Sequence, residues 1–177
     1  MFISTCFLMG VLISGTWWGG RSPDEATAVA RDAAGFLYVA GTTQSDDLPV
    51  VGGGIVVRPA KPNYPGDVFV QKMDAGGTVI WRAILGGSFT DRALALAVDK
   101  DGAVYVTGIT YSADFPITAA TYRRTFGNPN VLAGDAFLFK LTPFGSGLVY
   151  STFYGGSEGD QANAVTVDQA GQAIVVG

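Results

Sequence analysis

Short apolar runs, separated by turns that contain glycine and aspartate, cover most of the chain. Residues 93–99 alternate alanine with larger apolar side chains, and residues 103–110 are apolar on both faces. Two further runs, residues 135–141 and 148–154, are rich in aromatic and β-branched residues. Runs of roughly four to eight residues with this composition, bounded by turn residues, are typical of β-strands. The pattern therefore predicts an all-β chain of short strands.

The four runs belong to a unit that recurs along the chain. Each unit begins with a glycine pair and continues with an aspartate, alternating alanines and a D-x-x-G turn. The second glycines of the pairs, Gly20, Gly87 and Gly156, are spaced by about 68 residues, and a fixed period of this kind indicates a repeat architecture. We call the segment from each glycine pair to the next aspartate a glycine-pair loop.

The D-x-x-G motif joins the first and second runs of each unit. An aspartate at the first position of a type I turn can accept a hydrogen bond from the backbone ahead of it, and a glycine at the last position tolerates positive φ. The motif therefore predicts a β-hairpin. It occurs three times, as Asp32 with Gly35, Asp99 with Gly102, and Asp168 with Gly171.

Four antiparallel strands that are apolar on both faces need a sheet packed against each face. Radial stacking of four-stranded sheets meets this need, and it is the β-propeller architecture. Alanines recur on the first strand of each unit, where backbones crowd near a propeller's central axis. We expect an incomplete propeller with outer strands of a preceding blade in residues 1–20, full blades in 21–87 and 88–156, and half a blade in 157–177.

Residues 1–18 carry no charged side chain, and two interpretations stay open for them. An uncharged apolar N-terminal run is typical of a signal segment or a membrane anchor, although no Lys or Arg precedes this one. The stretch LISGTWWGG, residues 12–20, also aligns with LVYSTFYGG, residues 148–156. That alignment predicts the strand that precedes each glycine pair.

The repeated stretches resemble a known family. The stretch GGSFTDRALALAVDKDGAVYVTGITYSADFP, residues 86–116, is similar to the bacterial β-propeller repeats known as SBBP repeats, as are VYSTFYGG and GDAFLFKL. The matching unit from Gly19 ends in GTTQSDDLP, where Leu48 replaces the expected Phe. The resemblance implies an exported, surface-associated protein. We expect further blades from a longer parent chain or from another copy of this chain.

Composition and charge exclude several classes of function. The formal net charge is −4, and the chain lacks the cluster of Lys and Arg on which nucleic-acid affinity rests. His, the commonest general base and zinc ligand, is absent. The single cysteine, Cys6, allows no intrachain disulfide. We therefore expect no nucleic-acid partner and no His-dependent catalysis.

Asp24, Asp91 and Asp160 hold the same position in the repeat, at the entrance of the first strand. If that strand lines the central channel, the three carboxylates form an arc at one mouth of the channel. Because Ca²⁺ takes several oxygen ligands in loose geometry, one interpretation is a polar-ligand or calcium site, with Asp91 and Asp160 as metal candidates. The other is that each Asp binds loop amides and fixes the turn beside the glycine pair. No other cofactor is expected.

The exit of the second strand carries Ser-x-Asp followed by an apolar residue. Ser and Asp side chains can satisfy nearby backbone groups, so we expect these segments to bond their own backbone and to shape the exit, with the apolar residue packed underneath. The two examples are Ser45, Asp47 and Leu48, and Ser112, Asp114 and Phe115.

The long connections between the second and third strands, residues 41–66 and 108–134, are the expected binding surface. Loops longer than roughly 15 residues in a compact domain are commonly functional. Antiparallel alternation places these connections on the same face as the glycine-pair loops. Tyr111 and Tyr122 could stack on sugar rings or on a protein partner, or they could pin the connection to the blade beneath. The leading hypothesis is a non-enzymatic module that presents these connections to a protein or glycan ligand.

Two alternatives belong to other classes of function. One is a propeller hydrolase or lyase that uses the carboxylates at the channel mouth, with or without Ca²⁺. The other is a structural spacer or a gene fragment without independent function. The absence of His, and of two carboxylates at a defined separation, favours a binding module over an enzyme.

Overall fold

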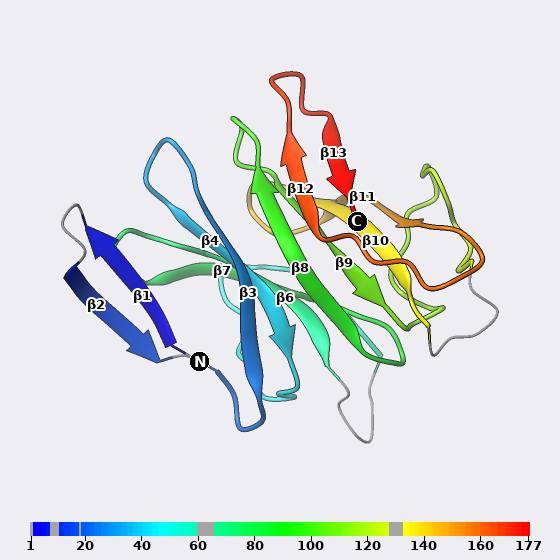
Figure 1. Ribbon diagram of the computed structural model, residues 1–177. Coiled ribbons are helices and arrows are strands. Elements are labelled where there is room, and N and C mark those ends of the chain that lie inside the picture. The colour runs from blue at the N-terminus through cyan, green and yellow to red at the C-terminus, as the bar shows by residue number, and fades with distance from the viewer. Residues whose placement is uncertain (1, 8–10, 18, 60–65, 128–132) are drawn as a thin grey trace.

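The computed structural model describes residues 2–7, 11–17, 19–59, 66–127 and 133–177. Over these residues the chain is all-β, and it contains no helix with the length and hydrophobicity needed to cross a membrane. The strands form four sheets that follow one another along the chain, from the blue N-terminal hairpin to the red C-terminal hairpin (Figure 1). The predicted all-β class, with antiparallel sheets that correspond to the blades of an incomplete propeller, is confirmed.

Two of the sheets are complete blades with the same strand order. The first is built from β3 (Asp24–Arg31), β4 (Leu37–Thr43), β6 (Asp67–Met73) and β7 (Val79–Leu85). The second is built from β8 (Asp91–Val98), β9 (Val104–Thr110), β10 (Asp135–Leu141) and β11 (Leu148–Tyr154). All neighbouring strands within these two sets of four are antiparallel, as the sequence predicted.

The two blades also share their irregularities. In the first-to-second strand ladder the register shifts between Ala26 and Ala28, and the shift recurs between Ala93 and Ala95. In the third-to-fourth strand ladder it shifts after Lys72 and again after Lys140. A β-bulge adds one unpaired residue and increases the local twist. Bulges at equivalent positions show that the repeat extends to the backbone geometry.

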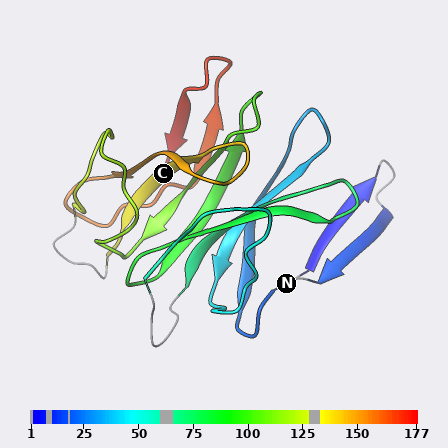
Figure 2. The same cartoon turned by 180° about the vertical axis from the view of Figure 1, so that it is seen from behind.

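Two shorter sheets flank the blades. β1 (Phe2–Phe7) and β2 (Val11–Trp17) form a hairpin before the first blade, and β12 (Ala164–Val167) and β13 (Ala173–Val176) form one after the second. Both views place these hairpins on opposite sides of the two blades (Figures 1 and 2). The assignment of residues 1–20 to a preceding blade, or to a signal segment, stays a prediction.

The main apolar core lies between the two blades. Tyr38, Val70 and Trp81 of the first blade pack in one cluster with residues of the second, including Phe137 and Phe139. The opposite face of the first blade buries a second cluster, formed by Val39, Leu48, Phe69, Met73 and Ile84. Both faces of the central strands of the first blade are therefore covered, as their unbroken apolar pattern predicted.

Each D-x-x-G motif forms the expected turn. The Gly35 N–H donates to the Asp32 carbonyl at 3.1 Å, and the Asp32 carboxylate accepts from the Phe36 N–H at 2.9 Å. Gly35 has a φ of +92°, which favours glycine. The same pair of bonds recurs in the turns that begin at Asp99 and Asp168.

The long connections fold back across their blades, which the sequence did not predict. After β4 the chain forms β5 (Val56–Val57), which pairs in parallel with the outer edge of β7. In the second blade the Thr118 N–H donates to the Ser151 carbonyl, and the Phe153 N–H donates to the Arg123 carbonyl, both at 3.1 Å. Each long connection therefore covers the edge of the outermost strand.

Candidate functional site

Each aspartate at the entrance of a first strand binds its own glycine-pair loop. The carboxylate accepts a hydrogen bond from the N–H of the second glycine of the pair. The donor–acceptor distances are 2.8 Å for Gly20 and Asp24, 2.7 Å for Gly87 and Asp91, and 2.6 Å for Gly156 and Asp160. The geometry is thus the amide-binding arrangement, one of the two interpretations of these residues.

The three carboxylates differ in burial and in further partners. Asp91 is fully buried and also accepts from the hydroxyls of Ser112, at 3.1 Å, and Thr110. Asp24 is partly exposed and accepts from the Ser45 hydroxyl at 3.0 Å. Asp160 is also partly exposed. The repeat therefore places the same bond in three different environments.

The Ser-x-Asp segments bind the glycine-pair loop rather than their own backbone. The Asp114 carboxylate accepts from the Ser88 N–H at 2.8 Å, and the Ser112 hydroxyl accepts from the Phe89 N–H at 2.9 Å. The loop lies so close that a side chain at Gly87 would come within 2.4 Å of Ser112. The prediction that these side chains bond their own backbone is therefore wrong, because their partners lie in the glycine-pair loop. The predicted burial is confirmed, since Leu48 and Phe115 are both buried.

The aspartates do not form a shared ligand set for a metal. Asp24, Asp91 and Asp160 each bind within their own loop. Among the residues that the structure describes, no group of three or more His, Cys, Asp or Glu side chains could hold a metal ion. The buried carboxylate of Asp91 accepts hydrogen bonds from N–H and O–H donors of its own blade. In the described part of the chain, the three carboxylates are thus engaged separately.

A small polar pocket lies between the entrances of the two blades, on the face of the glycine-pair loops. Its volume is ≈ 170 Å³. The Arg92 guanidinium pairs with the Glu25 carboxylate across it at 3.2 Å. The lining residues are Pro23, Asp24, Glu25, Thr42, Gln44, Thr90 and Arg92.

The long connection of the second blade presents an exposed aromatic pair. Tyr122 is 82% exposed and Tyr154, at the end of β11, is 50% exposed, and their ring centroids are 6.0 Å apart. Arg123 anchors the connection at this point, because its N–H donates to the Thr152 hydroxyl at 2.9 Å and its guanidinium donates to the carbonyl of Gly156 at 3.1 Å. The backbone beside Tyr122 is therefore bonded to β11 and to the glycine pair that follows it.

The other predicted aromatic, Tyr111, lies elsewhere on the connection. It is half-buried, and its N–H donates to the Thr90 carbonyl of the glycine-pair loop at 3.0 Å. Among the described ring contacts, Tyr111 does not meet Tyr122. Phe126 instead packs edge-to-face on Phe153, with 5.5 Å between centroids. The connection thus uses Phe126 as an anchor and leaves Tyr122 exposed.

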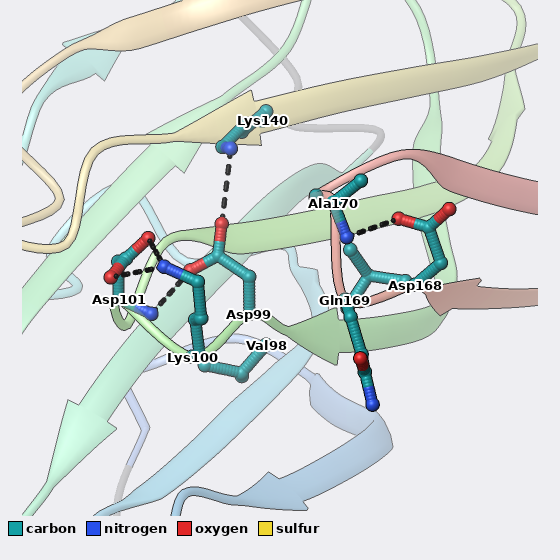
Figure 3. Close-up of a pocket in the computed structure, with 10 residues that line it drawn as sticks. Val98, Asp99, Lys100, Asp101, Lys140, Asp168, Gln169 and Ala170 are labelled. Atoms are coloured by element: carbon teal, nitrogen blue, oxygen red, sulfur yellow. Dashed lines mark hydrogen bonds and ion pairs between the residues drawn. The ribbon is translucent and has the colours of Figure 1, made fainter.

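A larger pocket lies on the opposite face, where the D-x-x-G turns emerge (Figure 3). Its volume is ≈ 580 Å³, and it lies between the turns of the second blade and of β12–β13. Figure 3 shows Lys140 directed toward Asp99, with Lys100 beside Asp101. The lining residues are Val98, Asp99, Lys100, Asp101, Lys140, Val167, Asp168, Gln169, Ala170 and Gly171.

A Lys–Asp–Tyr network forms one wall of this pocket. The Lys140 ammonium lies 3.0 Å from the Asp99 carboxylate and donates to the Tyr105 hydroxyl at 2.6 Å. Burial alone would lower the pKa of Lys140, but the hydrogen bonds to Tyr105 and Asp99 outweigh it and raise that pKa. The Tyr105 hydroxyl also donates to the Gly171 carbonyl at 2.8 Å, which joins the second blade to the next turn.

Sequence reasoning missed this network, although the sequence carries a signal for it. A tyrosine follows the turn aspartate by six residues in both complete units, as Tyr38 and Tyr105, and a lysine recurs on the third strand, as Lys72 and Lys140. In the first blade the Tyr38 hydroxyl donates to the turn aspartate, Asp32, at 3.0 Å. The repeat alone could therefore have identified the three positions.

Comparisons with known proteins bear on the repeat itself. Residues 18–49 match the family model SBBP, described as a beta-propeller repeat. A comparison with curated proteins found no match. The matched segment covers the first glycine-pair loop, β3, the D-x-x-G turn, β4 and the Ser-x-Asp exit, which are the parts whose geometry recurs in the second blade. Residues 18–49 thus carry an SBBP β-propeller repeat.

Proposed function

We propose that the chain is a non-enzymatic binding module of an exported or cell-surface protein, and that it presents its long connections to a protein or glycan ligand. The proposal rests on the exposed ring pair of Tyr122 and Tyr154. Tyrosine offers a large apolar face with a polar tip, and such side chains are enriched at interfaces and among the residues that dominate binding energy.

Rigidity of the ring pair supports this choice. Tyr154 ends a strand of the blade. Arg123, the neighbour of Tyr122, is bonded to β11 through its backbone and to the glycine pair after β11 through its guanidinium. Surface aromatics that are already held in position lose little conformational entropy on binding. The remaining carboxylate candidates for catalysis are engaged by loop amides, which favours a binding role over the hydrolase or lyase alternative.

Binding of the whole chain to arrays of oligosaccharides and of extracellular proteins tests the proposal. For the ligand found, Tyr122→Ala is expected to weaken binding by about tenfold or more, as for a residue central to an interface. The matched control is Phe144→Ala. Phe144 is also an exposed aromatic, at 74%, but it lies in the β10–β11 turn on the other face. Equal losses in both variants, or no binding to either array, would contradict the proposal and favour the structural spacer.

The export part of the proposal rests on the family resemblance. Intact cells that express the parent protein are expected to lose the module on treatment with external protease. Protection until the cells are lysed would contradict export.

A further inference from the structure

The small pocket between the entrances of the two blades lies where the side chains of the first blade depart from the repeat. Thr42, near the end of β4, and Gln44, just after it, line this pocket. At the equivalent positions, near the end of β9 and just after it, the second blade carries Ile109 and Tyr111. Two polar side chains of the first blade thus stand where the second blade has larger and more apolar ones.

The backbone at these positions follows the same path in both blades. The Gln44 N–H donates to the Pro23 carbonyl at 2.9 Å, and the Tyr111 N–H donates to the Thr90 carbonyl at 3.0 Å. The pocket therefore follows from the choice of side chains and not from a change in the fold.

Thr42 carries the observation that points to a ligand. The residue is only 7% exposed, and among the residues that the structure describes its hydroxyl has no hydrogen-bond partner. A buried polar group without a partner costs free energy and is uncommon in folded proteins. The β3–β4 ladder pairs Thr42 with Glu25, so both side chains lie on the face of the first blade that lines the pocket. A polar group bound there would give the Thr42 hydroxyl its missing hydrogen bond.

The other polar groups of the pocket supply both donors and acceptors. Glu25 and Arg92 form an ion pair at 3.2 Å, and their side chains are 62% and 48% exposed. Because exposed ion pairs contribute little to stability, a ligand can share or separate this pair at little cost. The Gln44 amide adds one acceptor and two N–H donors. This set of groups suits a ligand whose own groups both donate and accept, as hydroxyls do.

Hydrogen bonds between the two blades fix the walls of the pocket. The Thr27 hydroxyl donates to the Ala93 carbonyl at 2.7 Å, which joins β3 to β8. The Asp91 N–H donates to the Gly66 carbonyl at 3.0 Å, which joins the entrance of the second blade to the long connection of the first. A ligand therefore meets groups whose backbone is already in place, and little conformational entropy is lost on binding.

The volume of the pocket, ≈ 170 Å³, sets the size of the ligand. A cavity of about 150 Å³ holds benzene, which is a single six-membered ring. We propose that the pocket binds one pyranose sugar residue, whose hydroxyls bond to Thr42, Glu25 and Arg92. The site shares no lining residue with the exposed pair of Tyr122 and Tyr154, so the inference goes beyond the proposed function and does not depend on it.

Nuclear magnetic resonance of the isotope-labelled whole chain tests the proposal. The probes are the methyl pyranosides of glucose, galactose, mannose and fucose. A ligand of about a dozen non-hydrogen atoms binds with a Kd of about 1–10 mM. At least one of the probes is expected to shift the backbone amides of Glu25, Thr42 and Arg92 with a Kd in this range. No saturable shift of these amides with any probe, or a tighter response to glycine as a small zwitterion that matches the ion pair, would overturn the proposal.

Thr42→Ile is the matched variant, because the second blade already accommodates isoleucine at this position. It is expected to fill the pocket and to weaken sugar binding by about tenfold or more. It should also raise the thermal midpoint, since it removes a buried hydroxyl without a partner, and this second measurement shows that the variant folds. Thr42→Ser keeps the hydroxyl and should retain binding. Unchanged sugar affinity in Thr42→Ile contradicts the assigned site.

Two further variants locate the sugar. Arg92→Gln introduces the residue type that the third unit carries at this position, Gln161, and is expected to weaken binding by about tenfold by removing a charged donor. Tyr122→Ala should leave the affinity for the methyl pyranosides unchanged, whatever its effect on the ligand of the ring pair. Sugar binding that is lost in Tyr122→Ala but kept in Arg92→Gln would move the sugar to the ring pair and overturn the proposal.

Discussion

Asp91→Asn is the substitution that best separates a structural aspartate from a ligand-binding one. The Asp91 carboxylate is fully buried and accepts from the Gly87 N–H and from the hydroxyls of Thr110 and Ser112. The backbone N–H cannot rotate or accept, so the oxygen beside Gly87 must stay an oxygen. The new amide therefore faces Thr110, whose hydroxyl already accepts from the Ser112 N–H at 3.0 Å.

The expected cost follows from the bonds that change. A hydrogen bond to a charged group contributes roughly 1.5–3 kcal/mol. Asp91→Asn loses the bond from the Thr110 hydroxyl, and the bonds from the Gly87 N–H and the Ser112 hydroxyl then have a neutral acceptor. We expect a loss of about 2 kcal/mol in the free energy of unfolding, and about 4 kcal/mol for Asp91→Ala, which leaves buried donors without an acceptor. Asp160→Asn changes a partly exposed carboxylate and should cost less than about 1 kcal/mol.

Equilibrium urea unfolding of the whole chain, followed by circular dichroism, measures these differences. With a slope of about 2 kcal/mol per molar urea, Asp91→Asn should lower the midpoint by about 1 M. The series is repeated with EDTA, which should leave the differences unchanged. A neutral Asp91→Asn, an equally costly Asp160→Asn, or an effect of Asp91→Asn that vanishes in EDTA would refute the reasoning.

Three further predictions concern the blade interface and the ions. Gly145→Ala should lower the urea midpoint, with a cost of about 1–3 kcal/mol, because Gly145 has a φ of +66° and an added Cβ would lie 2.4 Å from the Trp81 ring. Lys140→Met should reduce stability at neutral pH. Burial alone would raise the pKa of Asp99, but hydrogen bonds, including that from Lys140, lower it below 3.8. The stabilisation by the ionised Asp99 is therefore present above pH 3.8 and is lost as the pH falls through the pKa of Asp99 in the folded protein. Urea titrations at successive pH values should show the stabilities of Lys140→Met and the unaltered protein converging in acid. Finally, EDTA should leave the thermal midpoint unchanged, whereas a rise on adding Ca²⁺ would reveal a bound ion.

Local patterns predicted the parts of the fold that depend on local chemistry. The D-x-x-G turns follow from the carboxylate of Asp32 and the positive φ of Gly35, both of which are properties of adjacent residues. The burial of both faces of the central strands follows from their unbroken apolar runs. The positions of the turns and the burial of the strands can therefore be predicted from the sequence, because they depend on residues that are close together along the chain.

The parts that were missed depend on distant partners. β5 is two residues long, lies in a glycine-rich segment and shows no alternation. β5 is a strand because it pairs with β7, and the adjacent Ile84 N–H donates to the Ile55 carbonyl at 2.9 Å. The Ser112 and Asp114 side chains likewise meet a loop far from them in sequence. Tyr105 and Lys140 recur in the sequence, but their meeting with Asp99 requires the register of three strands.

The covered outer edges determine in how many directions the molecule can associate. β5 occupies the rim of the first blade, and residues 118–123 occupy that of the second, so neither β7 nor β11 offers an unpaired edge there to a neighbouring molecule. Lateral growth by strand addition, the route to sheet-like aggregates, is blocked at both rims.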